Sequence, residues 1–127
     1  HPDLVVKKVA PGTRNMTVGP AMTREQAEGA ILTGVEVVGA EIEKGLDIVG
    51  TGDMGIGNTT SSAAIAVALT GIEPVKLAGR GTGVDNEGLK RKIDAVERAL
   101  KVNKPDPKDG LDVLAKVGGF EIALTSG

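Results

Sequence analysis

The chain has 127 residues and a net charge of -2, with one Phe and no Tyr, Trp or Cys. A disulfide framework and a thiolate metal site are thereby excluded, and a near-neutral chain without aromatic stacking platforms does not resemble a nucleic-acid binder. Nineteen glycines and 40% hydrophobic residues, without repeats, indicate a globular α/β protein with tight turns and an aliphatic core. No apolar run approaches the ~20 residues of a membrane span and no signal peptide is visible, so we expect a cytoplasmic protein.

The N-terminal third predicts an arm followed by a long helix. Residues 4–9 form a short β-like run that suits an edge strand or an extended arm. Thr23 and Gln26 make a capping-box pattern for a helix that continues to about Lys44. Gly45 is placed to end this helix in a left-handed cap.

The central stretch, residues 46–71, has the order strand, glycine loop, helix. An apolar run at 46–49 leads into a loop with glycines at positions 50, 52, 55 and 57. A polar triplet at 58–60 and a small-residue run at 61–69 then predict a helix that Gly71 ends. The sequence therefore predicts a strand and a helix joined by a loop without bulky side chains.

The remaining part predicts more helix than strand. Its expected elements are a connector at 72–78 with Pro74 in a first helical turn, a second glycine cluster at 79–83, a helix from the N-cap Asp85 to about Val102, a loop at 103–109, a helix at 110–117, and an element that begins at Phe120. Because the sequence starts at His1 rather than Met and stops soon after Phe120, we expect a piece of a longer protein.

The glycine loop at 50–57 suggests an anion site. Glycine reaches positive φ and lets a ligand approach the backbone, while a helix start presents unpaired N–H groups and the positive end of its dipole. Phosphate is the anion that such sites most often hold. Two alternatives remain open: the loop is only a tight turn, or Gly50, Gly52 and Gly55 are a dinucleotide motif with Glu73 as the ribose-binding acid.

Several motifs together closely resemble the nicotinate-nucleotide–dimethylbenzimidazole phosphoribosyltransferase family. The residues that carry the resemblance are 52–60 (GDMGIGNTT), 79–83 (GRGTG) and the helix containing 90–92 (KRK). Further matches lie at 11–15, 20–23 and 118–123, in the same order as in the family. The resemblance thus covers nearly the whole chain.

This resemblance implies transfer of phosphoribose from nicotinate mononucleotide to 5,6-dimethylbenzimidazole, giving nicotinate and an α-ribazole phosphate. It also implies a Rossmann-like parallel sheet with flanking helices, a homodimer, and no metal or organic cofactor. Residues 1–22 would be an N-terminal arm and 23–127 the central, incomplete part of the nucleotide-binding α/β domain. A non-catalytic nucleotide-binding module and half of a dinucleotide-dependent oxidoreductase are the other functions we consider.

The resemblance also assigns the substrate-binding residues: Asp53, Met54, Gly55, Ile56, Gly57, Asn58, Thr59 and Lys92. The backbone of Gly55 and Gly57 would lie against phosphate or ribose, and Lys92 would face the phosphate. Asp53 stands where related enzymes carry an acid, often Glu, near the sugar and base, so it is the candidate catalytic residue. Its alternative role is to accept N–H bonds within the loop. The family's general base, a glutamate, would lie beyond Gly127.

Overall fold

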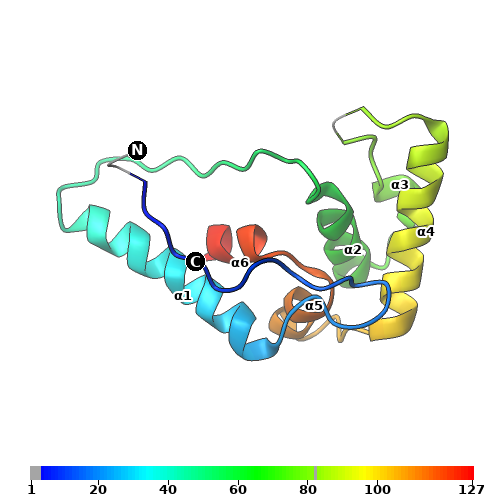
Figure 1. The fold of residues 1–127 in the computed structure, drawn as a ribbon, viewed down its shortest axis with the longest axis horizontal. Helices are drawn as coiled ribbons and strands as arrows, with labels where there is room; N and C mark the ends of the chain where they lie inside the picture. The colour runs from blue at the N-terminus through cyan, green and yellow to red at the C-terminus, as the bar shows by residue number, and fades with distance from the viewer. Residues whose placement is uncertain (1–3, 82) are drawn as a thin grey trace.

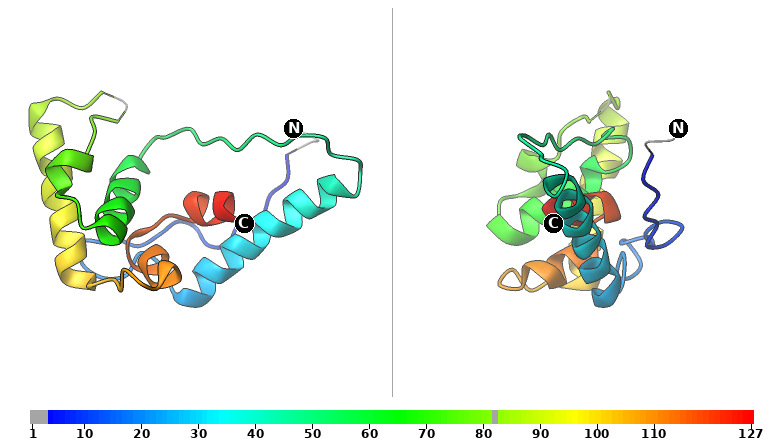
Figure 2. Two further views of the ribbon diagram at one scale, coloured as in Figure 1. Left: turned by 180° about the vertical axis from the view of Figure 1, so that it is seen from behind. Right: turned by 90° about the vertical axis from the view of Figure 1, so that its left-hand side faces the viewer.

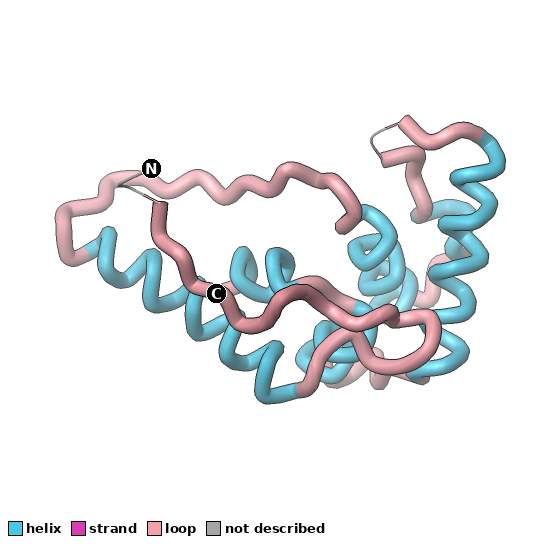
Figure 3. The backbone as a smooth tube through the Cα atoms, viewed as in Figure 1, coloured by secondary structure: helices cyan, strands magenta, loops and turns pink. Residues whose placement is uncertain are grey.

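The computed structural model describes residues 4–81 and 83–127, in which all regular secondary structure is helical (Figure 1, Figure 3). The helices are α1 (Arg24–Ile42), α2 (Thr59–Thr70), α3 (Pro74–Leu77), α4 (Asn86–Asn103), α5 (Gly110–Val117) and α6 (Phe120–Ser126). α1 packs on α5 and α6, and α2 packs on α3, α4 and α5 (Figure 2). α5 therefore joins two helical groups. None of the helices in the described residues is long and apolar enough to cross a membrane.

The described residues do not form the predicted parallel sheet, so the strand expected at 46–49 is not observed, and of the two interpretations of 4–9 the extended arm is the one that the structure shows. Both segments run as extended chain without a strand partner (Figure 3). A strand needs a second strand to accept and donate its backbone hydrogen bonds. Most of the apolar side chains that suggested strands are exposed, and Ile48 is 86% exposed, whereas Val9 is partly buried against the core.

The predicted start of α1 is confirmed. The Thr23 hydroxyl accepts from the Gln26 amide at 3.2 Å, and the Gln26 side chain accepts from the Thr23 amide at 3.0 Å. Gly45, which follows the helix, has a positive φ of 91° and donates its N–H to the Ile42 carbonyl. The capping box and the glycine thus bound the helix as the sequence indicates.

The later helices lie where the sequence predicts them, although only α4 among α2, α3, α4 and α6 has a side-chain cap at its start. Gly71 ends α2 in the left-handed conformation with φ 70°, and Pro74 occupies the first turn of α3. The Asp85 carboxylate caps α4 by accepting from the Gly88 amide at 2.7 Å. The element expected at Phe120 is the short helix α6.

Two clusters of small and aliphatic side chains form the core, and α5 contributes to both. The first joins α1, α5 and α6 and contains Met22, Ala27, Ala30, Leu114, Ala115 and Ala123. The second joins α2, α4 and α5 and contains Ala63, Ala64, Val96, Ala99, Val113 and Val117. Because more than half of these residues are alanines, the helices approach closely. This packing fixes the start of α2 relative to α4 and α6, which surround the glycine loop.

An ion pair also ties α1 to the start of α5. Arg24 donates to Asp109 at 2.7 Å, while Asp109 caps α5 through the amides of Leu111 and Asp112. The hydrogen bond from Arg24, with those from the backbone amides, lowers the pKa of Asp109 below its ordinary value. The charged carboxylate therefore serves as cap and ion-pair partner at once.

Candidate functional site

The glycine loop lies at the end of the long extended segment that leads into α2 (Figure 1). Gly55 has φ 75° and Gly57 has φ 86°, so the backbone turns twice through a region that disfavours side chains. A Cβ added at either glycine would meet no other atom within 4 Å. Their conformation, and not crowding within the protein, is what requires glycine here.

Asp53 closes this loop. Its Oδ1 accepts from the Gly55 amide at 2.6 Å and from the Asn58 side-chain amide at 2.7 Å. Asn58 holds the N-cap position of α2, but its side chain makes no capping bond to the helix. Asp53 therefore has the predicted role of accepting a backbone N–H bond within the loop. The Gly55 amide already donates to Asp53 and is not free for a ligand.

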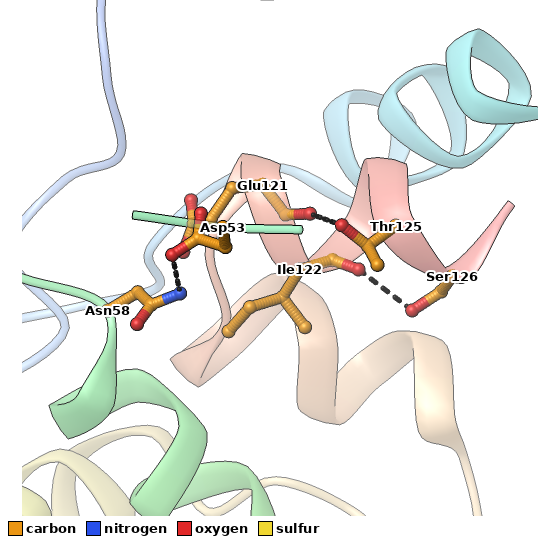
Figure 4. A pocket seen from close by; sticks show the side chains of 6 residues that line it. All are labelled: Asp53, Asn58, Glu121, Ile122, Thr125 and Ser126. Atoms are coloured by element: carbon orange, nitrogen blue, oxygen red, sulfur yellow. Dashed lines mark hydrogen bonds between the residues drawn. The ribbon is translucent and has the colours of Figure 1, made fainter. Parts of the chain in front are cut away.

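One side of the loop borders a cleft of about 460 Å³, which we call the acidic cleft. Its lining residues are Gly12, Thr13, Asp53, Met54, Ile56, Gly57, Asn58, Ser61, Gly119, Phe120 and Glu121. A smaller hollow of about 230 Å³ shares Asp53, Asn58 and Glu121 with it and continues along α6 (Figure 4). Asp53 and Glu121 are the acidic residues in this lining.

The other side of the loop borders a cleft of about 320 Å³, which we call the basic cleft. It is lined by Gly57, Thr59, Thr60, Arg80, Val84, Gly88, Arg91 and Lys92. The first turn of α2 contributes Thr59 and Thr60. The backbone N–H groups in a first helical turn have no acceptor within the helix. The helix dipole and three basic side chains therefore act on the same space.

Lys92 bridges α4 and α2 at this cleft. Its Nζ donates to the Thr59 hydroxyl at 2.7 Å and to the Gly79 carbonyl at 2.9 Å. An ammonium group has three donors, so these two contacts position the group and leave a donor for an anion. Arg80 differs, because its guanidinium donates to the Val84 carbonyl and the Asn86 side chain and so closes its own loop.

The structure distributes the predicted site residues over the two clefts. Asp53, Met54, Ile56 and Asn58 line the acidic cleft, Thr59 and Lys92 line the basic cleft, Gly57 lines both, and Gly55 lines neither. Our assignment missed six other residues that line the acidic cleft, namely Gly12, Thr13, Ser61, Gly119, Phe120 and Glu121. The motifs at 11–15 and 118–123 contain all of them except Ser61 and were the signal for them.

The dinucleotide interpretation lacks the structure that it requires. Glu73 stands before α3 rather than at the end of a strand, and it pairs with Lys76 at 3.0 Å in a solvent-exposed contact. The helix after the glycine loop begins at Thr59, well beyond the motif that ends at Gly55. A ribose-binding acid at the end of a second strand is therefore absent from the described residues.

Comparison with known proteins identifies the family. The model of a family described as phosphoribosyltransferase matches residues 1–127. The chain belongs to this family. The nicotinate-nucleotide–dimethylbenzimidazole phosphoribosyltransferase of Desulforudis audaxviator is 56% identical over 125 residues, which are 98% of this chain and 35% of that protein. The enzyme of the same name from Dehalococcoides mccartyi is 55% identical over 126 residues, 99% of this chain and 36% of that protein.

A solved structure of this family has the same local fold. The crystal structure of CobT from Thermus thermophilus matches with a TM-score of 0.89 and 50% sequence identity. The match covers 98% of this chain and 37% of that one. The chain thus spans little more than a third of the length of the family members that it matches.

Proposed function

We propose that this chain is the phosphate-binding part of an enzyme that transfers phosphoribose from nicotinate mononucleotide to 5,6-dimethylbenzimidazole, in the assembly of the cobalamin lower ligand. The products are nicotinate and α-ribazole phosphate. The observation that carries the proposal is the separation of charge around one glycine loop, with basic groups on one side and carboxylates on the other. The names of the relatives, which are 55% and 56% identical, supply the reaction.

The charges set the orientation of the nucleotide. The phosphate lies in the basic cleft, where Lys92, Arg91 and the first turn of α2 attract an anion. The sugar and base extend past Gly57, which lines both clefts and has no side chain to obstruct them. They then reach the acidic cleft, where Asp53 and the apolar Met54 and Ile56 lie.

In the transfer, the bond between the sugar carbon and the nicotinate nitrogen breaks, and a bond to a benzimidazole nitrogen forms. Positive charge develops on the sugar as the first bond lengthens, and a fixed carboxylate nearby stabilises it. Asp53 suits this role because two donors hold its Oδ1, which fixes the carboxylate without any rearrangement. As the resemblance implies, the benzimidazole proton goes to a glutamate outside these 127 residues, so this chain orients the nucleotide and does not accept the proton.

The extended segments at 4–9 and 46–49 complete the proposal for the fold. We propose that they become strands of a Rossmann-like parallel sheet when the other two thirds of the family's length is present. Their side chains suit a covered sheet, because Leu4, Val6 and Ile48 are 68%, 74% and 86% exposed here. The same proposal includes an N-terminal arm at 1–22 and the central part of the nucleotide-binding domain at 23–127. It also includes a homodimer and a cytoplasmic location.

A transfer assay tests the function. The protein is expressed from its complete reading frame and incubated with nicotinate mononucleotide and 5,6-dimethylbenzimidazole, and α-ribazole phosphate is separated by chromatography. We expect equal amounts of nicotinate and α-ribazole phosphate, without added metal or organic cofactor. Binding of nicotinate mononucleotide without product would support the non-catalytic module instead. Binding of NADH without binding of the mononucleotide would support the dinucleotide alternative.

A further inference from the structure

Glu121 lines the acidic cleft, and the proposed function assigns it no role. It is the second residue of α6, directly after Phe120, and Gly119 is the N-cap. Glu121 lines the acidic cleft and the smaller hollow, each time together with Asp53 (Figure 4). Two carboxylates from distant parts of the sequence therefore border the same space.

The Glu121 carboxylate occupies space next to Gly119 that a side chain at position 119 would fill. A Cβ at position 119 would lie 2.1 Å from Glu121 Oε1 and 2.6 Å from Oε2, so the carboxylate takes the place of a side chain. The φ of Gly119 is -138°, a conformation that any residue adopts. A side chain at 119 would therefore displace the Glu121 carboxylate from its present position, whereas the backbone there accepts any residue.

The hydroxyl groups next to the Glu121 carboxylate donate to backbone carbonyls and not to the carboxylate. Thr125 and Ser126 line the smaller hollow, but their hydroxyls donate to the backbone carbonyls of Glu121 and Ile122 at 2.7 and 2.8 Å. The ion pairs found among the described residues do not include Glu121. Its carboxylate oxygens therefore face the cleft as hydrogen-bond acceptors.

We infer that Glu121 determines specificity for the sugar of the bound nucleotide, with its carboxylate accepting hydrogen bonds from the ribose hydroxyls. This rests on the proposed function, which places the sugar next to Asp53 in the same cleft. An ionised carboxylate only accepts hydrogen bonds, and a ribose presents neighbouring hydroxyl donors to it. A site built to accept from a hydroxyl rejects the analogue that lacks it, because the acceptor is left buried without a partner.

The test compares nicotinate mononucleotide with its 2′-deoxy and 3′-deoxy analogues in the transfer assay, using protein from the complete reading frame. We expect the unaltered protein to favour the ribonucleotide over at least one deoxy analogue by roughly 10- to 100-fold in kcat/KM. E121A should reduce that preference to within about threefold, by losing activity on the ribonucleotide and not on the deoxy analogue. E121Q, which keeps one acceptor oxygen, should show a preference between that of the unaltered protein and that of E121A.

Two further variants separate this role from a structural one. E25Q is the matched control, because Glu25 is likewise the second residue of its helix but lines neither cleft nor the smaller hollow, and it should leave the preference unchanged. G119A should lower the preference as E121A does, since the new methyl group displaces the carboxylate. The double variant G119A/E121A should lose no more than E121A alone.

Equal losses on ribonucleotide and deoxynucleotide in E121A would overturn the inference and leave Glu121 a structural role. An unaltered protein that transfers phosphoribose without discriminating either deoxy analogue would overturn it as well, while the proposed function would stand. An unaltered protein that neither binds nor transfers nicotinate mononucleotide would overturn the proposed function and this inference with it.

Discussion

Replacing Lys92 with methionine should lower kcat/KM for nicotinate mononucleotide by roughly 10- to 100-fold, mainly through a higher KM. Methionine keeps much of the length of the side chain but removes the positive charge and the donors that reach Thr59 and the Gly79 carbonyl. The charge also stands at the start of α2, where the helix dipole already favours an anion. The transfer assay at several nucleotide concentrations measures the effect.

Lys90→Met is the matched control for this variant. Lys90 lies on the same helix and is exposed, but it lines neither the acidic nor the basic cleft. Its replacement should change kcat/KM by less than about twofold, as expected of a solvated surface charge. Thermal unfolding of both variants shows whether Lys92→Met also loosens the contact between α4 and α2. Equal kinetic effects at positions 90 and 92 would contradict the assignment of Lys92 to the phosphate.

Replacing Gly34 with alanine should destabilise the protein by roughly 1–3 kcal/mol. Gly34 lies inside α1, where alanine is normally favoured over glycine by about 1 kcal/mol. Here the added Cβ would lie 2.1 Å from the Leu124 carbonyl oxygen of α6, so the backbones of the two helices have to move apart. Urea unfolding monitored by circular dichroism gives the free energy of unfolding.

Gly39→Ala is the control with the opposite sign. Gly39 lies in the same helix, and a Cβ there would meet nothing within 4 Å. This variant should therefore stabilise the protein by about 0.5–1 kcal/mol, as helix propensity alone predicts. If both alanine variants stabilised the protein, α6 would not pack on α1 as the structure has it.

The sequence predicted most helices because their ends carry local signals. Thr23 with Gln26, Asp85 and Gly71 act on the residues next to them, so each helix end can be read without knowing the rest of the fold. The strand expected at 46–49 is not formed among the described residues for a physical reason, since its hydrogen bonds depend on a partner strand that no local pattern specifies. The packing of the helices could not be predicted either, because nothing in the sequence around Gly34 indicates that α6 lies against it.

The candidate site was predictable only in part. Glycine permits the positive φ seen at Gly55 and Gly57, but Gly50 and Gly52 of the same loop do not adopt it, so residue type alone did not determine the turns. The loop-closing contact of Asp53 was one of the roles predicted for it. The role of Lys92 came from the resemblance, because a lysine on an amphipathic helix is usually solvated. Glu121 was in a recognised motif, but only the folded chain brings it to the cleft that Asp53 lines.

The central claim is that the turn from Gly57 into α2, together with Lys92, binds the phosphate of a mononucleotide. Titration of isotope-labelled protein with nicotinate mononucleotide, followed by amide resonances, tests it most directly, with nicotinate riboside as the ligand that lacks only the phosphate. The account predicts that the amides of Gly57, Thr59 and Thr60 shift with the mononucleotide and much less with the riboside. Equal shifts with both ligands, or none at millimolar mononucleotide, would contradict it.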